Sequence, residues 1–581
     1  MNPRHIASAV ALILAGCGIG HATGTGNKVH LKIVAINDFH GQLESPGNFR
    51  NLPTDASATI PVGGIDWLAG SIADLKAKNP NTVVVSAGDL IGATPLLSAL
   101  FHDEPTIETM NRAGLEINAV GNHEFDEGKA ELLRMQNGGC HPTDPNSCQG
   151  AAVGTPVPFE GAAFQFLAAN VVEKATRQTI FPAYTIKQYE GVKVGFIGVT
   201  LKETPTIVTP SGVAGLKFKD EAHTINQASR ELLAQGAKAV VVLIHQGGTL
   251  PVTQAAATIN TCDGNLDGSP IKSIVAGLNN RIDLVISGHT HQAYNCRLPN
   301  RVGRSIPVTS ANSQGRVYTD IDMVLNKTSG NVISVNATNV VVDRRNAAIT
   351  PDAGIKQIVD GYKSLAGPIA NRTIGSITAD LTRANSAGGE NAMGDVIADA
   401  QWEATQAPGF GGAVAAFMNP GGVRADLLFA GSAAGEGDGN VTFGEAFTVQ
   451  PFGNSLVTLT LTGAQIETLL EQQFTGCANN QPFNRILLPS ASVGYAWSAS
   501  GPACDKVDPA SIKIGGVVVD PAASYRITVN SFLADGGDNF SVLTQGTNRL
   551  GGALDSDALE AYFRAHSPIA PPTLDRIQPL P

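Results

Sequence analysis

Short runs of Val, Ile and Leu recur along the first part of the chain, and each run is followed by a polar turn and then by a helical stretch. The runs predict strands at 29–36, 82–86, 193–200, 239–244 and 282–287. Their nearly continuous apolar content is typical of strands that are buried on both faces of a sheet. We expect helices at 64–77 and 224–236. The pattern therefore predicts an α/β domain over residues 27–342.

The second part of the chain repeats this organisation after a linker. Residues 343–372 contain one helical stretch, 354–366, which is followed by Pro368. We interpret this segment as a helical linker. From 373 to 581 the pattern restarts, with a helix at 391–406 and strands at 413–418, 455–461 and 525–530. The total length of 581 residues is enough for two such domains, each with its own core.

The N-terminus, residues 1–26, has the pattern of an export signal and a short spacer. Arg4 and His5 precede an apolar run that is too short to span a bilayer and is typical of a removed signal. Two cleavage sites remain open. The segment LAGC at 14–17 would leave Cys17 as a lipid-anchored first residue, and GHA at 20–22 would release a soluble protein. We expect a lipid-anchored protein of the periplasm or cell envelope, with secretion as the alternative.

The cysteine count agrees with export. Six cysteines remain when Cys17 is set aside, and an even number suits an oxidising compartment. Proximity along the chain favours three disulfides, with buried free thiols as the alternative: Cys140–Cys148, Cys262–Cys296 and Cys477–Cys504. The first pair would close a surface loop at 136–160, which is rich in Gly, Pro and Asn.

The formal net charge of −11 limits the classes of ligand. Proteins that bind nucleic-acid polymers need clustered Lys and Arg, so this class is not expected. An acidic protein still binds small phosphates where metal ions supply the local positive charge. No feature of the sequence indicates an obligate protein partner.

Five of the 12 histidines fall just past predicted strands, within short polar clusters. The clusters are NDFHG at 37–41, SAGD at 86–89, GNHEFD at 121–126, HQGG at 245–248 and SGHTH at 287–291. Ligands of α/β sheets bind beyond the carboxyl ends of the strands. We therefore expect the five clusters to meet at one site.

The residue types in these clusters predict a two-metal centre. A mixture of carboxylate, amide and imidazole donors suits Zn, Mn or Fe better than Ca or Mg. Seven candidate ligands fill two sites only if one is shared, and Asp89 is the natural bridge. Two ions about 3.5–4 Å apart clamp a phosphoryl group for displacement. The seven candidates are Asp38, His40, Asp89, Asn122, His245, His289 and His291.

The motif series D-x-H, GD, GNHE, H and GHxH resembles the calcineurin-like metallophosphatases. The longer segments NDFHG, AGDLIGATPL and GNHEFDEG resemble the 5′-nucleotidase branch of that family, which includes the periplasmic UDP-sugar hydrolase/5′-nucleotidases. The resemblance covers nearly the whole mature chain. It implies an N-terminal metallophosphatase β-sandwich flanked by helices, and a C-terminal α/β 5′-nucleotidase domain that binds the substrate. It also implies hydrolysis of nucleoside 5′-phosphates, with UDP-sugars as further candidate substrates.

The resemblance implies a role for each matching residue of the first domain. One metal would be bound by Asp38, His40, Asp89 and His291, and the other by Asp89, Asn122, His245 and His289. His123 and Asp126 match the family's catalytic pair. His123 would stabilise the charge on the transferring phosphoryl group, and Asp126 would orient His123 from the next helical turn.

Three clusters of the second domain also match the family: NPGGVR at 419–424, PFGN at 451–454 and NSFLADGGD at 530–538. The resemblance implies that Phe452 and Phe532 stack on the nucleobase. It implies further that Arg424 binds the phosphate, Asn454 the base edge and Asp538 the ribose hydroxyls.

One feature of the second domain departs from the family pattern. Nucleotidases of this family have arginines just before the segment that corresponds to 390–394, and here 387–389 is Ala-Gly-Gly. At least one phosphate-binding Arg is therefore absent, and Arg383 is the candidate substitute.

Two alternative functions remain open. The first is a 2′,3′-cyclic-nucleotide phosphodiesterase/3′-nucleotidase, but that branch tends to have Asn where this chain has Asp126. The second is a non-catalytic nucleotide-binding surface protein. Such a protein would be expected to have lost metal ligands, whereas all seven positions have competent residues here.

Overall fold

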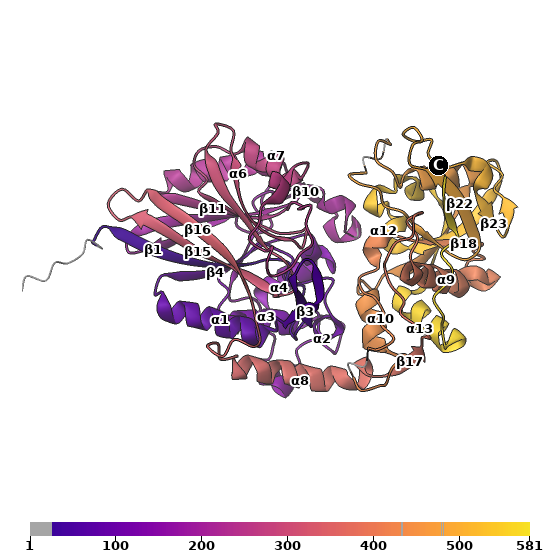
Figure 1. Cartoon of the computed structure of the whole chain (residues 1–581), viewed down its shortest axis with the longest axis horizontal. Coiled ribbons are helices and arrows are strands. Elements are labelled where there is room, and N and C mark those ends of the chain that lie inside the picture. Colours follow the sequence, from indigo (N-terminus) through magenta and orange to yellow (C-terminus); the bar gives the residue numbers. More distant parts are fainter. Residues whose placement is uncertain (1–25, 209, 432–433, 478, 480, 581) are drawn as a thin grey trace, which may run out of the picture.

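The computed structural model describes residues 26–208, 210–431, 434–477, 479 and 481–580. The chain forms two lobes that follow one another in sequence (Figure 1). The predicted signal and Cys17 lie outside the described residues. Within the described part, no helix is both long enough and apolar enough to cross a bilayer.

The first lobe contains two six-stranded sheets. The first sheet has the order β16-β15-β1-β4-β5-β6, with β1 (Lys28–Ile36), β4 (Thr82–Ser86), β5 (Ile117–Ala119), β6 (Gln165–Leu167), β15 (Val317–Asn326) and β16 (Val332–Val341). The second has the order β13-β14-β12-β11-β9-β8, with β8 (Tyr184–Tyr189), β9 (Val192–Thr200), β11 (Ala239–His245), β12 (Leu284–Ser287), β13 (Ala293–Pro299) and β14 (Ser305–Ala311).

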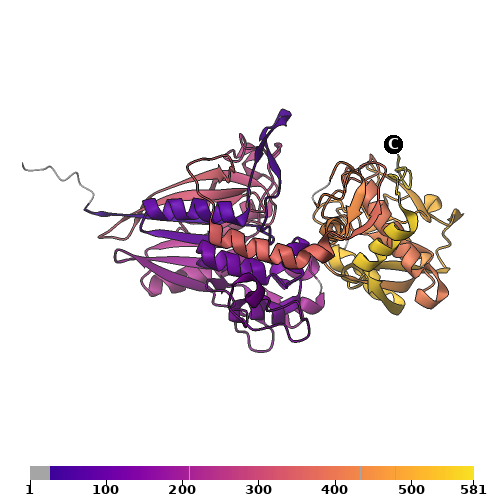
Figure 2. The ribbon, with the colours of Figure 1, turned by 90° about the horizontal axis from the view of Figure 1, so that it is seen from below.

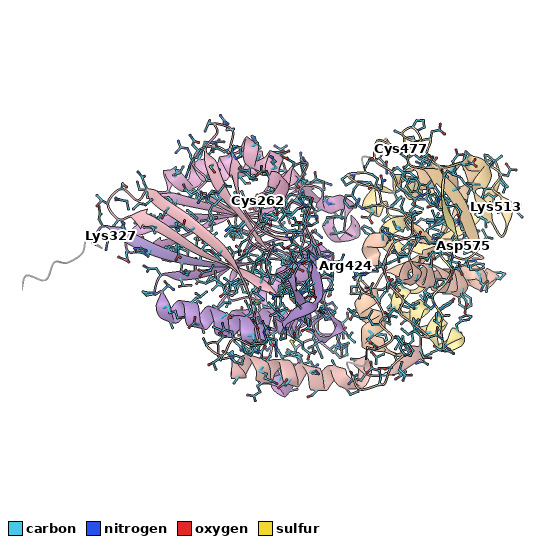
Figure 3. All side chains as sticks on the ribbon, viewed as in Figure 1. Cys262, Lys327, Arg424, Cys477, Lys513 and Asp575 are labelled. Atoms are coloured by element: carbon cyan, nitrogen blue, oxygen red, sulfur yellow. A yellow bond between two sulfur atoms is a disulfide. The ribbon has the colours of Figure 1, made fainter. Side chains whose placement is uncertain are left out.

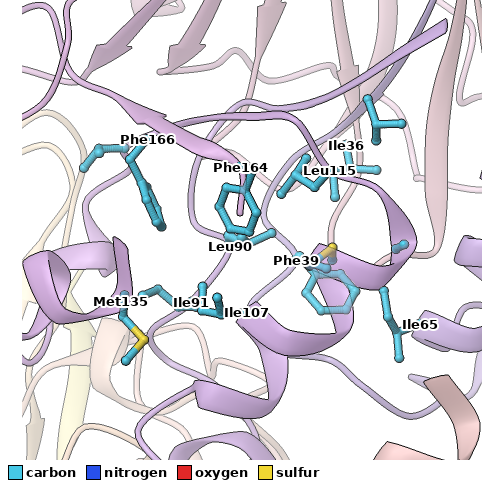
Figure 4. Close-up of a cluster of buried hydrophobic side chains, with 14 of the residues drawn as sticks. Ile36, Phe39, Ile65, Leu90, Ile91, Ile107, Leu115, Met135, Phe164 and Phe166 are labelled. Carbon is cyan, nitrogen blue, oxygen red and sulfur yellow. The ribbon is translucent and has the colours of Figure 1, made fainter. Parts of the chain in front are cut away.

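The two sheets pack face to face and enclose an apolar core. Ile33 and Val83 from the first sheet join Phe196 and Val241 from the second, and all four are fully buried. Helices α1 (Ile65–Lys78) and α3 (Glu104–Ala113) cover the outer face of the first sheet. Figure 4 shows part of the buried hydrophobic cluster between them, which includes Ile65 of α1, Ile107 of α3 and Ile36 of the sheet. Helices α6 (Glu221–Ala234) and α7 (Pro270–Gly277) cover the second. The predicted β-sandwich flanked by helices is confirmed.

Strand direction determines where the polar clusters lie. Strand β4 pairs in parallel with β1 and β5, and β11 pairs in parallel with β9 and β12. The carboxyl ends of parallel strands point to the same edge of a sheet. The turns after β1, β4, β5, β11 and β12 therefore lie together at one edge of the sandwich.

Two helix boundaries differ from the prediction. Helix α6 begins before 224, because the side chain of Asp220 caps it by accepting a hydrogen bond from the backbone N–H of His223 at 2.8 Å. Helix α8 (Ala353–Ala370) does not end before Pro368 but continues through it. Proline in the last turn costs only one helical hydrogen bond, and Gly367 has no Cβ to clash with the proline ring.

Helix α8 also differs from a free linker in its packing. Tyr362 is fully buried against Phe101 and Val153, and its hydroxyl donates to Glu108 Oε2 at 3.0 Å. Figures 1 and 2 show α8 lying along the first lobe and ending where the second begins. The helix is therefore part of the first lobe by its contacts. Contacts with the second lobe follow at once, because Arg372 pairs with Glu560 and lies 5.2 Å from the centre of the Phe443 ring.

The second lobe is built around a five-stranded mixed sheet with the order β21-β18-β25-β20-β26. Its strands are β18 (Ala415–Met418), β20 (Ser455–Thr462), β21 (Leu488–Pro489), β25 (Ser524–Asn530) and β26 (Thr547–Leu554). Helices α9 (Ala392–Gln406) and α13 (Asp555–His566) pack on one face of this sheet, and α11 (Gly463–Glu471) packs on the other. The predicted helix at 391–406 and the three predicted strands are confirmed to within two residues.

Three disulfides join the six described cysteines in the predicted pairs, Cys140–Cys148, Cys262–Cys296 and Cys477–Cys504. Figure 3 labels Cys262 in the first lobe and Cys477 in the second. The alternative of buried free thiols is therefore wrong for these six residues. The loop closed by Cys140–Cys148 leads directly into a short helix, α5 (Gly150–Val153).

Candidate active site

The turns after the parallel strands are joined by backbone hydrogen bonds. Asp38 N–H donates to Gly88 O at 2.9 Å, and His40 N–H donates to Asp89 O at 3.0 Å. Five of the seven candidate ligands have a positive φ: Asp38 (50°), His40 (49°), Asp89 (50°), His289 (73°) and His291 (56°). Asp and His tolerate the left-handed region better than most residues. Gly88 is needed at its position because a Cβ there would lie 2.7 Å from His245 Nδ1.

The turns bring the candidate ligands into two groups that match the two predicted metal sites. Asp38, His40 and His291 place ligand atoms within 4.8 Å of one another, and Asp89, His245 and His289 do the same. Asp89 lies between the groups, because its Oδ2 is 2.9 Å from His245 Nε2 and 3.7 Å from His40 Nε2.

The atoms at the centre of these groups fit divalent cations. The Nδ1 atoms of His40 and His245 lie 2.8 and 2.9 Å from the carbonyl oxygens of Gly92 and Ala87, which makes Nδ1 the donor. Each Nε2 then presents a lone pair to the centre, where His40 Nε2 lies 3.1 Å from His291 Nε2. Asn122 Oδ1 is buried and has no hydrogen-bond partner among the residues that the structure describes. Electron-pair donors this close together need a cation between them.

The electrostatics of the protein groups also favour cations. Burial alone would lower the pKa of His245, but the carboxylates of Asp89 and Asp38 outweigh burial and raise it to about 9. A proton on Nε2 and a bound cation would compete for the same lone pair. Burial raises the pKa of Asp38 to about 7. The buried carboxylates therefore create an excess of negative potential that bound cations would neutralise.

Glu124 organises the site and was not predicted to have a role. Its buried carboxylate accepts hydrogen bonds from three backbone N–H groups, those of Asp89 (3.0 Å), Leu90 (2.8 Å) and Gly121 (2.6 Å). It thus ties the turn after β4 to the turn after β5. The residue is visible in the GNHE motif, but nothing in the sequence indicates which backbone groups it binds.

His123 and Asp126 form a pair beside the ligand groups. A 3-10 turn at His123–Phe125 brings His123 Nδ1 within 2.9 Å of Asp126 Oδ2, and this oxygen also accepts from Ala93 N–H at 3.0 Å. Burial lowers the pKa of His123, but the carboxylates of Asp126 and Asp89 outweigh burial, so the net shift is upward. The geometry favours a cationic imidazole held in a fixed orientation.

Residues of the second lobe reach this pair directly. The ring of Phe452 stacks on the imidazole of His123, with 5.8 Å between centroids and an angle of 17°. The guanidinium of Arg424 lies 5.7 Å from the centre of the Phe452 ring, and Figure 3 labels Arg424 at the junction of the lobes. The lobes therefore meet at the candidate catalytic pair.

A cavity of about 250 Å³ lies at this junction and has walls from both lobes. The first lobe contributes Asn122, His123, Asp126 and His289. The second contributes all five predicted substrate-binding residues, Arg424, Phe452, Asn454, Phe532 and Asp538.

The local structure holds these side chains in place. Phe532 lies in a short helix, α12 (Ser531–Ala534). Its ring packs on Gly537, where a Cβ would be 2.5 Å from the ring. Asn419 Nδ2 donates to Asp538 Oδ2 at 3.0 Å, and Ser531 Oγ donates to Asn454 Oδ1 at 3.1 Å.

Arg383 does not replace the absent arginine. Its Nε donates to Asp426 Oδ1 at 2.9 Å and its Nη1 donates to Arg424 O at 2.8 Å. It therefore supports the backbone of the Arg424 turn and is not among the residues that line the cavity. Phe483 and Arg485 do line the cavity, and the sequence interpretation missed both. The segment PFNR at 482–485 resembles PFGN at 451–454, and this similarity was the available signal.

Comparison with known proteins agrees with this geometry. Residues 31–293 match the family model described as calcineurin-like phosphoesterase, and residues 370–545 match the 5′-nucleotidase C-terminal domain. The chain is 32% identical over 578 residues to a cell wall protein, Lmo0130, of Listeria monocytogenes, covering 94% of this chain and 69% of the relative. The chain belongs to the 5′-nucleotidase family of calcineurin-like metallophosphatases.

Other family members show how the chain relates to longer and solved proteins. It is 30% identical over 562 residues to the endonuclease YhcR of Bacillus subtilis, of which it spans 41%, while 94% of this chain is covered. The 5′-nucleotidase precursor from Thermus thermophilus has a similar fold, with a TM-score of 0.74, 24% identity, and coverage of 95% of this chain and 99% of that one. Family membership establishes a metal-dependent phosphomonoesterase with a site for two divalent ions.

Proposed function

We propose that the protein is an exported 5′-nucleotidase that releases phosphate from nucleoside 5′-monophosphates. The observation that carries the proposal is the shared cavity. Its metal side contains His123 and His289, and its other side contains two aromatic rings, Phe452 and Phe532, and the guanidinium of Arg424. A cavity with a phosphate-binding end and aromatic walls suits a substrate that has one phosphate and one base.

The seven ligand residues would hold two divalent ions of the Zn, Mn or Fe class, with Asp89 shared between them. Bound ions would supply positive charge that stabilises the phosphoryl oxygens and lowers the pKa of the attacking water. The protein prepares this site by fixing the tautomers of His40 and His245 through backbone carbonyls.

His123, Asp126 and Arg424 would act on the phosphoryl group itself. A cationic His123 donates from Nε2 to a phosphoryl oxygen as negative charge develops, while Asp126 keeps Nδ1 protonated and the ring oriented. Arg424 approaches from the second lobe and adds a second positive charge. The leaving O5′ of the nucleoside would take up a proton as the P–O5′ bond breaks.

The remaining predicted residues would select the nucleoside. Phe452 and Phe532 stack on the base, Asn454 contacts its edge and Asp538 accepts hydrogen bonds from the ribose hydroxyls. Three disulfides support an oxidising compartment and agree with the predicted export signal. The proposed protein is lipid-anchored at Cys17 and has a metallophosphatase domain at 27–342 and a substrate-binding domain at 373–581. The helical segment at 343–372, which packs on the first domain, joins the two.

A substrate panel with metal-depleted and reconstituted protein tests the function. We expect phosphate release from AMP after reconstitution with Zn, Mn or Fe, and none after chelation. Slower release from 3′-AMP and from 2′,3′-cyclic AMP is expected, and UDP-glucose measures the sugar-nucleotide activity. Faster turnover of the cyclic nucleotide than of AMP would replace the proposal with the 3′-nucleotidase alternative.

A further inference from the structure

The cavity contains a cation that the proposed function does not use. Arg485 lines the cavity, and only 12% of its side chain is exposed. It lies on the segment between α11 and β21, away from the three clusters that match the family's substrate-binding loops. A buried guanidinium is costly unless it has anionic or polar partners.

The partners of Arg485 leave part of its hydrogen-bonding capacity unused. Nη1 donates to Gln481 Oε1 at 2.9 Å, and Nε lies 3.5 Å from Asp538 Oδ1, which is beyond a good hydrogen bond. In the described part of the chain, Nη2 makes no hydrogen bond. The ring of Phe483 stacks on the guanidinium at 4.4 Å and fixes its plane. Arg485 is thus oriented and retains donors for a ligand.

The position of Arg485 relative to the metals indicates which part of a ligand it meets. Arg424 lies over the ring of Phe452, which stacks on His123 at the metal side. Arg424 Nη1 lies 3.4 Å from Gly421 O, and a Cβ on Gly421 would lie 3.6 Å from Asp538 Oδ2. Asp538 Oδ1 in turn lies 3.5 Å from Arg485 Nε. The order across the cavity is therefore metal centre, Arg424, Asp538 and Arg485. A group beside Asp538 and remote from the metals meets Arg485.

We propose that Arg485 forms a second anion subsite, which binds a phosphate group at the ribose 3′ position. This position is next to the 2′ hydroxyl that Asp538 contacts. This inference rests on the proposed function, because it takes Asp538 as the ribose-binding residue. The substrate class is a nucleoside bisphosphate with one phosphate at the 5′ position and one at the 3′ position. Asp538 accepts a hydrogen bond from the free 2′ hydroxyl, and Arg485 donates to the 3′-phosphate.

The reaction at the metal centre is unchanged for such a substrate. Water adds to the 5′ phosphorus, the P–O5′ bond breaks and O5′ takes a proton. The products are orthophosphate and a nucleoside 3′-phosphate, and the 3′ P–O bond stays intact. Arg485 affects binding and therefore KM, and it does not touch the reacting atoms.

Kinetics with AMP and adenosine 3′,5′-bisphosphate test the subsite in wild type, in Arg485→Gln and in a matched surface control, Arg564→Gln. Arg564 is 59% exposed and pairs with Glu560 on α13. Loss of a charge-assisted hydrogen bond should raise KM for the bisphosphate by about tenfold to 100-fold in Arg485→Gln, with at most about a threefold change for AMP. The control should change neither value. An equal rise for both substrates would mean that Arg485 only supports Asp538, and would overturn the proposal.

Two further measurements keep the test decisive. Titration calorimetry of wild type should show adenosine 3′-phosphate binding about tenfold tighter than adenosine, and equal affinities would overturn the proposal even if Arg485→Gln does not fold. If Arg485→Gln changes only the ratio of the KM values for GMP and AMP, then Arg485 contacts the base. That result would also overturn the proposal. Absence of AMP hydrolysis in reconstituted wild type would refute the proposed function alone, because the calorimetry does not depend on turnover.

Discussion

Removal of the Phe532 ring separates base recognition from chemistry. Phe532 lines the cavity and packs on Gly537, and no ring contact joins it to His123 among the described residues. Stacking contributes roughly 1–3 kcal/mol per base. At about 1.4 kcal/mol per factor of ten, Phe532→Ala should raise KM for AMP by about 5- to 150-fold. Its kcat should change little.

The assay compares AMP with p-nitrophenyl phosphate, which has no nucleobase. Phe532→Ala should leave hydrolysis of p-nitrophenyl phosphate near the wild-type rate, and Phe532→Leu, which keeps apolar bulk without a π-face, should behave similarly. Phe452→Ala is different because Phe452 also stacks on His123. We expect it to lower kcat for both substrates in addition to its effect on AMP binding. Equal losses on AMP and p-nitrophenyl phosphate in Phe532→Ala would refute the role of this ring in base binding.

Three other predictions concern the metals, the catalytic pair and the pH dependence of stability. Asp89→Ala should lose most of the roughly two metal ions per chain in elemental analysis, whereas exposed Asp267→Ala should keep them; full metal content in Asp89→Ala would contradict the shared-ligand assignment. His123→Ala should keep its metals and lose about 10²-fold or more in kcat for AMP, and unchanged turnover would remove His123 from the mechanism. The hydrogen bond to Glu127 raises the pKa of His102 from 6.5 to about 9, so its stabilising effect is complete below pH 6.5 and is lost as pH rises through about 9. After allowance for solvent screening we expect about 1–2 kcal/mol, seen as a fall in the urea midpoint between pH 6.5 and about pH 10 in wild type. The part of this fall that His102 causes should be absent in His102→Gln, and an identical fall in both proteins would contradict the assignment.

The sequence predicts those features that depend on neighbouring residues or on strand direction. Strand β4 coincides with its predicted range because four of the five residues of TVVVS are β-branched and because Asn81 precedes the strand and Gly88 follows soon after it. The convergence of the histidine clusters is also predictable, because parallel strands place their carboxyl ends at one edge.

Features that depend on contacts between distant segments were not predictable. Glu124 binds backbone N–H groups, which have no sequence signature. Helix α8 passes through Pro368 and packs on the first lobe by burying Tyr362, which the helical pattern alone does not show. The stacking of Phe452 on His123 joins residues more than 300 positions apart, and it exists only once both lobes have folded.

The left-handed backbone at Asp38, His40, Asp89, His289 and His291 limits how this site can change over evolutionary time. Side chains that branch at Cβ are strained in that conformation, whereas Gly, Asn and Asp are tolerated. A descendant that abandons catalysis should therefore replace these ligands with Gly, Asn or Asp, and not with Val, Ile or Thr. Glycine at several of the five positions would then mark an inactive paralogue, even where the rest of the motif series has diverged beyond recognition.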